Sequence, residues 1–247
     1  MVRICIVVLG FSLVGCTRAA KEISAPPTKA LEIREENAQL LSNLGNYPNL
    51  ESLRISCLEG LQVFPDSIGN LPRLKELIID NGNGCAMNPV LPESIGNLTS
   101  LEKLVLYGAQ DPGTPDHPDI QPSERHKFPA GMSRLKNLVY LDLGRNGLSE
   151  VPSFVKDLPK LQELGFAWNI ELKEIPKFLT ELRELTTLKL DSDGLTDLPD
   201  FLSTLPKLSR ITLGNNRAIT KNQSKMKQLR KRFPRISFDF EDEYDYP

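Results

Sequence analysis

The stretch that decides the fold is Leu138–Leu148, which reads LVYLDLGRNGL. Its leucines Leu138, Leu141 and Leu143 follow the pattern L-x-x-L-x-L. Side chains along a strand point alternately to opposite faces, so Leu141 and Leu143 point to one face of a short strand. A strand this short cannot bury its leucines alone, and the stretch therefore predicts a unit that is repeated and stacked.

The same pattern occurs seven times along the chain. Most copies begin about 23 residues apart, a period typical of solenoids. Their first leucines are Leu50, Leu74, Leu101, Leu138, Leu161, Leu185 and Leu208. Stacked copies bury their leucines in one continuous core and pair their strands in parallel, about 4.8 Å apart. We therefore expect a curved sheet of seven parallel strands.

A second half-motif follows each of the first six copies: an apolar residue and then a proline. The prolines are Pro65, Pro92, Pro129, Pro152, Pro176 and Pro199. Proline fixes φ and lacks an N–H, so it ends the strand. Apolar residues spaced by three then suit a helical or 3₁₀ turn on the opposite side of the core. The fold class is thus α/β: a solenoid with a parallel concave sheet and short helical or 3₁₀ turns on its convex side.

The unit resembles the leucine-rich repeat, whose signature is L-x-x-L-x-L-x-x-N-x-L. Asn146, Asn169 and Asn216 occupy its asparagine position, and Asp193 replaces the asparagine in the sixth copy. The resemblance implies that these side chains hydrogen-bond to backbone between neighbouring turns. It covers roughly residues 45–240. The first three copies lack the asparagine and carry Leu58, Gly82 and Ala109 instead.

Both ends of such a solenoid need caps, because a terminal repeat would expose its core. Apolar residues within 31–44 predict an N-terminal capping helix. A basic helix is expected over 221–232, and alternation of apolar and polar residues over 236–240 predicts a final capping strand. The capped leucine-rich repeat domain then spans 31–240. Residues 241–247 form an acidic tail.

The N-terminus has the features of an export signal. Arg3 precedes an apolar run over 4–14, which is shorter than the roughly 20 residues that a membrane-spanning helix needs. Such a run is typical of a secretory signal. It ends in Leu13-Val14-Gly15-Cys16, which resembles the lipobox of bacterial lipoproteins. An ordinary signal peptide with a chance cysteine is the alternative.

The lipobox resemblance implies a signal peptide over 1–15, a lipid on Cys16 and a lipidated linker over 16–30. It implies membrane attachment through that lipid. Thr17 follows the cysteine where an aspartate would favour inner-membrane retention, so the chain resembles the outer-membrane class. Whether the protein would face the periplasm or the cell surface stays open.

Composition and motifs argue against several classes of function. The formal net charge of −2 gives no reason to expect nucleic acid as a partner. No glycine-rich phosphate motif occurs, and no cofactor is expected. The two histidines, His117 and His126, share one proline-rich segment, so neither is placed as a base beside an acid. We therefore do not expect an enzyme.

The cysteines and histidines also give little support for a metal site. Cys57, Cys85, His117 and His126 belong to the first three copies, but no C-x-x-C pair occurs among them. Cys57 and Cys85 follow strands of adjacent copies, and an exported protein meets oxidising surroundings. A Cys57–Cys85 disulfide and two free thiols both remain open.

The third copy is longer than the others because it contains the segment 110–127, rich in proline and acidic residues. A long loop on a rigid scaffold often carries function. A tolerated insertion is the alternative. Both interpretations stay open.

The candidate binding site is the concave face of the sheet. Tyrosine, tryptophan and arginine are enriched at the energetic centres of interfaces. Ile78, Val105, Tyr107, Tyr140 and Trp168 are expected to form an exposed apolar and aromatic stripe, although ordinary exposed strand residues would give the same pattern. The candidate binding residues are Arg54, Ile78, Val105, Tyr107, Tyr140, Asp142, Arg145, Trp168, Lys189 and Arg210.

The leading functional hypothesis is an envelope-anchored protein that binds another protein through this concave face. The partner is a host protein or another envelope protein, and we expect the chain itself to be a monomer. The first alternative is a non-catalytic scaffold of the cell envelope. The second, less favoured, is an envelope hydrolase.

Overall fold

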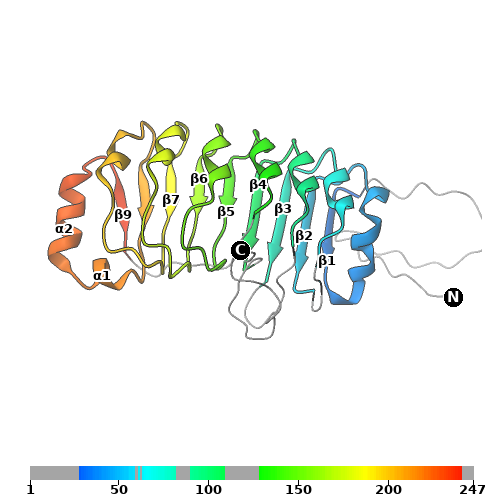
Figure 1. The fold of residues 1–247 in the computed structure, drawn as a ribbon, viewed down its shortest axis with the longest axis horizontal. Helices are drawn as coiled ribbons and strands as arrows, with labels where there is room; N and C mark the ends of the chain where they lie inside the picture. Colours follow the sequence, from blue (N-terminus) through cyan, green and yellow to red (C-terminus); the bar gives the residue numbers. More distant parts are fainter. Residues whose placement is uncertain (1–27, 59–60, 62, 82–89, 109–127, 241–247) are drawn as a thin grey trace, which may run out of the picture.

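The computed structural model describes residues 28–58, 61, 63–81, 90–108 and 128–240. Their strands form one open sheet in which every neighbouring pair is parallel and the spatial order is the sequence order (Figure 1). The strands are β1 Ala30–Ile33, β2 Ser52–Ser56, β3 Glu76–Asp80, β4 Lys103–Tyr107, β5 Tyr140–Asp142, β6 Glu163–Gly165, β7 Thr187–Lys189, β8 Arg210–Thr212 and β9 Ser237–Asp239.

The register of the sheet stacks the repeated leucines in rows. Leu141 of β5 is paired with Leu104 on one side and Leu164 on the other, and Leu188 continues the row. All four side chains have 0% exposure. One apolar cluster runs from Ile33 to Ile236. The prediction of a continuous aliphatic core is therefore confirmed.

The opposite side of the core is covered by 3₁₀ segments. Each begins directly after one of the six expected prolines. The carbonyl of Pro65 accepts the N–H of Ile68 at 3.1 Å, which is the i→i+3 bond of a 3₁₀ turn. The segments are η2 Asp66–Asn70, η3 Glu93–Asn97, η4 Ala130–Arg134, η5 Ser153–Asp157, η6 Lys177–Glu181 and η7 Asp200–Thr204.

The asparagines link neighbouring turns, as the family resemblance implies. The side-chain amide of Asn146 donates to the Leu106 carbonyl at 2.7 Å. Asn169 donates in the same way to Leu143 at 3.1 Å, and Asn216 donates to the Leu190 carbonyl. Buried backbone carbonyls need a donor, so this ladder satisfies one carbonyl of each preceding turn.

The N-terminal cap differs from the expected helix over 31–44. Residues Ala30–Ile33 form strand β1, which pairs with β2 so that Leu31 meets Leu53 and Ile33 meets Ile55. The irregular 3₁₀ segment η1 Glu35–Asn46 follows it. Leu31 and Ile33 alternate with polar residues, which is the period of a strand. The cap is therefore a further turn of the solenoid without the L-x-x-L-x-L pattern.

The C-terminal cap matches its prediction. Short helix α1 Arg217–Thr220 and helix α2 Gln223–Arg232 lead to strand β9, which is paired with β8. With β1 and β9 the sheet has nine strands instead of the seven expected. Figure 1 shows α2 at the end of the solenoid opposite to β1.

Several expectations fall on residues outside the described part: the signal peptide over 1–15, Cys16, most of the linker, the segment 110–127 and the acidic tail. Within the described ranges, none of the helices has the length and apolar character needed to cross a membrane.

Candidate functional site

Each strand presents one face to the core and one away from it. The residues that alternate with the core leucines form what is here termed the outer face, and adjacent strands align them in rows. This is the face expected to bind. Its members on β3 to β7 are Glu76, Ile78, Asp80, Lys103, Val105, Tyr107, Tyr140, Asp142, Glu163, Gly165, Thr187 and Lys189.

The expected exposed apolar stripe is wrong for three of its members. Ile78, Val105 and Tyr107 are only 3%, 1% and 1% exposed, and they form a cluster of their own with Tyr140 packed against it. Ile78 lies beside Val105 in the sheet. The Tyr107 ring lies over Gly144, where an added Cβ would come within 2.9 Å of ring carbons. The alternation of residues along each strand places these side chains on the correct face of the sheet. It does not predict that side chains of neighbouring strands pack against one another there.

Tyr140 lies at the centre of the polar part of the outer face. The Lys189 ammonium lies 4.9 Å from the centroid of the Tyr140 ring, and the Lys103 ammonium lies 5.6 Å from it. Lys189 also donates to the Tyr140 hydroxyl at 3.3 Å. A cation within about 6 Å of an aromatic face is attracted to it. The half-buried tyrosine is thus held between cations from β4 and β7.

Carboxylates complete this arrangement. Glu76 lies 2.9 Å from Lys103, and Glu163 lies 3.5 Å from Lys189. Exposed pairs of this kind contribute little to stability because water and salt screen them. Their alternating signs nevertheless give the face a fixed charge pattern, which is a means of selecting a partner.

The environment shifts two pKa values at this centre. Burial, and to a lesser degree Asp142, raises the pKa of the Tyr140 phenol, although Lys189 opposes the shift. Burial would lower the pKa of Lys189, but Tyr140, Glu163 and Asp142 together raise it. At neutral pH the phenol is therefore neutral and donates to the Asp142 carboxylate at 3.4 Å, whereas the Lys189 ammonium is charged and has three N–H groups with which to donate.

Asp142 was expected to contact a partner, but it is 4% exposed. Its carboxylate accepts the N–H of Gly144 at 2.9 Å and fills the space above Gly165, where a Cβ would lie 3.0 Å from it. Asp191 accepts the N–H of Gly214 in the same way at 2.7 Å. The two aspartates accept hydrogen bonds from backbone N–H groups and so stabilise the fold. The alternation of residues in the sequence does not distinguish such aspartates from exposed ones.

Arg145 and Trp168 lie just beyond the strand ends, at equivalent positions of neighbouring turns. Arg145 has a φ of 55° and Trp168 a φ of 67°. Gly108, at the equivalent position of the turn before Arg145, has a φ of 62°. Their N–H groups still donate to the adjacent turn, Trp168 to the Asp191 carbonyl at 2.8 Å. Cys57, Ser192 and Asn215 also have positive φ at the same position of their turns, so this backbone conformation belongs to the repeat and does not by itself mark a functional position.

Trp168 is the exposed aromatic of this edge. Its side chain is 41% exposed, and Ile170, two residues on, is 66% exposed. Sequence reasoning missed Ile170 because it lies in a turn, outside the strand alternation. Exposed aromatic and aliphatic side chains close together in the chain are typical of an interface anchor.

The two remaining predicted residues lie toward opposite ends of the sheet. Arg54 of β2 lies 4.0 Å from Asp80, and Arg210 of β8 lies 3.1 Å from Asp239. Six strand spacings of about 4.8 Å separate the two arginines by about 29 Å. The ten predicted residues therefore span most of the sheet, and four of them are buried: Ile78, Val105, Tyr107 and Asp142.

The cysteines and histidines are the residues that metal or thiol chemistry would use. No group of three or more histidine, cysteine or acidic side chains that could hold a metal occurs among the described residues. Cys57 is disulfide-bonded. The other cysteines, Cys5, Cys16 and Cys85, and both histidines lie outside the described ranges.

The stacked parallel strands, 3₁₀ turns and asparagine ladder define a leucine-rich repeat solenoid. Internalin C2 of Listeria monocytogenes is similar at 23% identity and TM-score 0.50, over 70% of this chain and 65% of that one. The internalin InlF of the same species is 17% identical, with TM-score 0.52, over 82% and 58%. Listeria InlP is 25% identical, with TM-score 0.57, over 75% and 49%.

This chain spans about half to two thirds of the length of those structures. The likeness shows the fold, and these neighbours are bacterial leucine-rich repeat proteins. No protein-family model and no curated protein matches the chain.

Proposed function

We propose that this chain is a binding protein of the bacterial envelope that binds another protein through the outer face of its sheet and the adjoining turn edge, which is formed by Arg145, Trp168 and Ile170 just beyond the strand ends. The observation that carries the proposal is the exposure of Trp168 and Ile170, which follow the end of β6. The polar centre at Tyr140 lies at the other end of the same strands, on the outer face. Interfaces commonly combine a few apolar anchors with a polar surround. The leucine-rich repeat fold, an interaction scaffold, supports this reading. We propose no catalytic role.

We further propose that the chain is exported and held at the outer membrane by a lipid on Cys16, after removal of residues 1–15. The lipobox resemblance of Leu13-Val14-Gly15-Cys16 supports this. Metabolic labelling with a radioactive fatty acid should mark the wild-type protein. Cys16→Ser should lose both the label and the membrane association. A wild-type protein that is labelled but soluble, or membrane-bound but unlabelled, would contradict the proposal.

The binding proposal is tested by capture from envelope extract and, separately, from host extracellular proteins. The test variant is Trp168→Ala with Ile170→Ala. The matched control is Val63→Ala with Val90→Ala, because these valines are also exposed, by 59% and 57%, and lie outside the turn edge. A partner retained by the control and lost by the test variant supports the proposal. Equal capture by both variants contradicts the assigned site.

The source of the captured protein then separates the two kinds of partner. Capture from host material favours adhesion, and capture from envelope extract favours assembly within the envelope. Thermal unfolding of both variants verifies that each is folded, since exposed residues contribute little to stability.

We also propose that the disulfide of Cys57 is made with Cys85. The two follow β2 and β3, which are neighbours in the sheet. Mass spectrometry of a non-reduced digest should detect one peptide pair that contains both residues. A pair of Cys57 with any other cysteine would contradict it.

A further inference from the structure

The C-terminal cap concentrates positive charge. Residues 217–235 contain eight lysines and arginines and no acidic residue, whereas the whole chain has a formal net charge of −2. A solenoid end needs a polar surface, but side chains of both signs serve that purpose. A surface of one sign instead creates a field that attracts anions.

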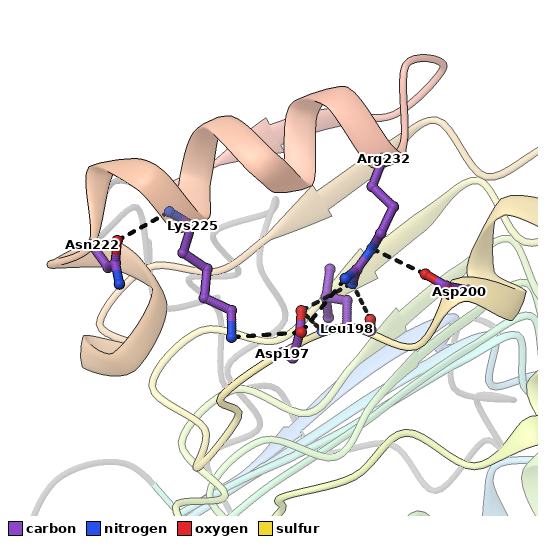
Figure 2. A network of polar contacts seen from close by, with 6 residues as sticks. All are labelled: Asp197, Leu198, Asp200, Asn222, Lys225 and Arg232. Atoms are coloured by element: carbon purple, nitrogen blue, oxygen red, sulfur yellow. Dashed lines mark hydrogen bonds and ion pairs between the residues drawn. The ribbon is translucent and has the colours of Figure 1, made fainter.

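Two of these cations hold the cap against the preceding turn (Figure 2). The Lys225 ammonium lies 3.5 Å from the Asp197 carboxylate. The Arg232 guanidinium lies 2.9 Å from Asp197 and 3.1 Å from Asp200. Burial would raise the pKa of Asp197, but Arg232 and Lys225 outweigh it and lower that pKa. These two cations therefore have a structural use.

The other six cations are not neutralised in this way. None forms an ion pair with a described residue. Arg230 lies 5.0 Å from the centroid of the Phe240 ring, and Arg235 donates to the Ser203 carbonyl at 2.6 Å, but neither contact neutralises charge. All six are exposed: Arg217, Lys221, Lys227, Arg230, Lys231 and Arg235.

The apolar side of α2 is already occupied. Leu229 is fully buried, and Met226 packs against the core beside it. The helix therefore has no apolar face left to insert into a hydrocarbon layer, unlike an interfacial amphipathic helix. Any attraction of this surface to an anionic partner must be electrostatic and must weaken with salt.

We propose that this basic cap, defined by the six exposed cations, binds the anionic headgroups of a lipid bilayer. Basic clusters of about four to eight residues are attracted to anionic lipid without a specific pocket. A single-sign, aromatic-poor surface matches a layer of headgroups in charge and needs no shape complementarity. The cap lies at one end of the solenoid, so bilayer contact there leaves the outer face accessible (Figure 1).

Other anionic partners fit the basic cap less well. Protein interfaces depend on exposed aromatic or large apolar anchors. The exposed large apolar residues of the described part are Val63, Val90, Trp168 and Ile170, and none of these belongs to the cap. Single-stranded nucleic acid would need exposed aromatic side chains for base stacking, whereas in the cap Phe233 is 1% exposed and Phe238 and Phe240 are half-buried and stacked on each other.

The test is co-sedimentation of the full chain with phosphatidylcholine vesicles, with and without phosphatidylglycerol. The zwitterionic vesicles report any contribution of the apolar N-terminus. The cap variant is Lys221→Gln, Lys227→Gln and Lys231→Gln. The matched control, Lys156→Gln, Lys177→Gln and Arg183→Gln, removes the same charge from other exposed positions of the described chain.

Wild type and control should bind the anionic vesicles more tightly than the zwitterionic ones, and the cap variant should lose about tenfold or more of that gain. The gain should vanish near about 1 M salt, where the Debye length is about 3 Å. Equal loss in control and cap variant would overturn the assignment to the cap, as would no loss in either. Tighter binding to duplex DNA or to an acidic peptide than to anionic vesicles would overturn the bilayer as partner.

Discussion

The two faces of the sheet are built from the same strands but follow different rules. On the inner face, Leu104, Leu141 and Leu164 repeat in register and have no exposed area. On the outer face, the residues beside them are Val105, Asp142 and Gly165, which share neither size nor polarity. The difference shows that the inner face alone specifies the solenoid. The outer face combines a packed part, which includes Ile78, Val105 and Tyr107, with exposed residues, and selection for a partner acts on the exposed ones.

The largest contrast between the faces is expected from substitutions of adjacent residues on β6. Leu164→Ala should lower the free energy of unfolding by about 2–5 kcal/mol, because it leaves a cavity in a close-packed core. Glu163→Ala, on the outer face of the same strand, should change it by less than about 0.5 kcal/mol. Urea unfolding measures both, and similar losses would remove the distinction.

A second substitution tests whether part of the outer face is itself packed. Gly144→Ala should destabilise the fold by about 1–3 kcal/mol, because the new methyl group must displace the Tyr107 ring. Thr187→Ala is the control, since Thr187 is half-buried on the same face. Thermal unfolding compares the two. An unchanged Gly144→Ala protein would mean that the ring moves aside freely.

The asparagine ladder contains one break, which gives a pH-dependent prediction. One carboxylate oxygen of Asp193 accepts the Asn169 N–H at 2.9 Å, and the other is buried without a partner. Burial, together with the charges of Asp191 and Asp142, raises the pKa of Asp193 well above its ordinary value. An asparagine could donate to a carbonyl of the preceding turn. Asp193→Asn should therefore stabilise the fold by about 1–3 kcal/mol.

The sign of the pH effect follows from the raised pKa. The folded state holds the Asp193 proton to higher pH than the unfolded chain does, so stability falls as pH rises from the unfolded pKa toward the folded one. The advantage of Asp193→Asn should accordingly be small near about pH 4 and larger at about pH 8. Urea unfolding across this range measures it. If the stabilisation by Asp193→Asn became smaller as pH rises, the raised pKa of Asp193 would be contradicted.

The inner face and the outer face also differ in how far the sequence predicts them. The spacing of the leucines and the six prolines predicts the core, the strands and the 3₁₀ turns. This works because leucine burial and the missing N–H of proline each act within a single repeat. The same rules do not predict β1, whose turn lacks the leucine pattern. They place Tyr107 and Asp142 on the correct face but do not predict their burial, because Tyr107 packs over Gly144, just beyond β5, and Asp142 packs over Gly165 of β6. Ile170 escapes them because it lies in a turn.

The most direct test of binding at the turn edge is photo-crosslinking in intact producing cells, with host proteins present or absent. A photo-reactive phenylalanine analogue replaces Trp168 in one chain and Val90, which is 57% exposed, in the control. We expect a discrete cross-linked partner from position 168 and none from position 90. Cross-links to one partner from position 90 alone, or equally from both, would contradict a binding site at the outer face and its turn edge.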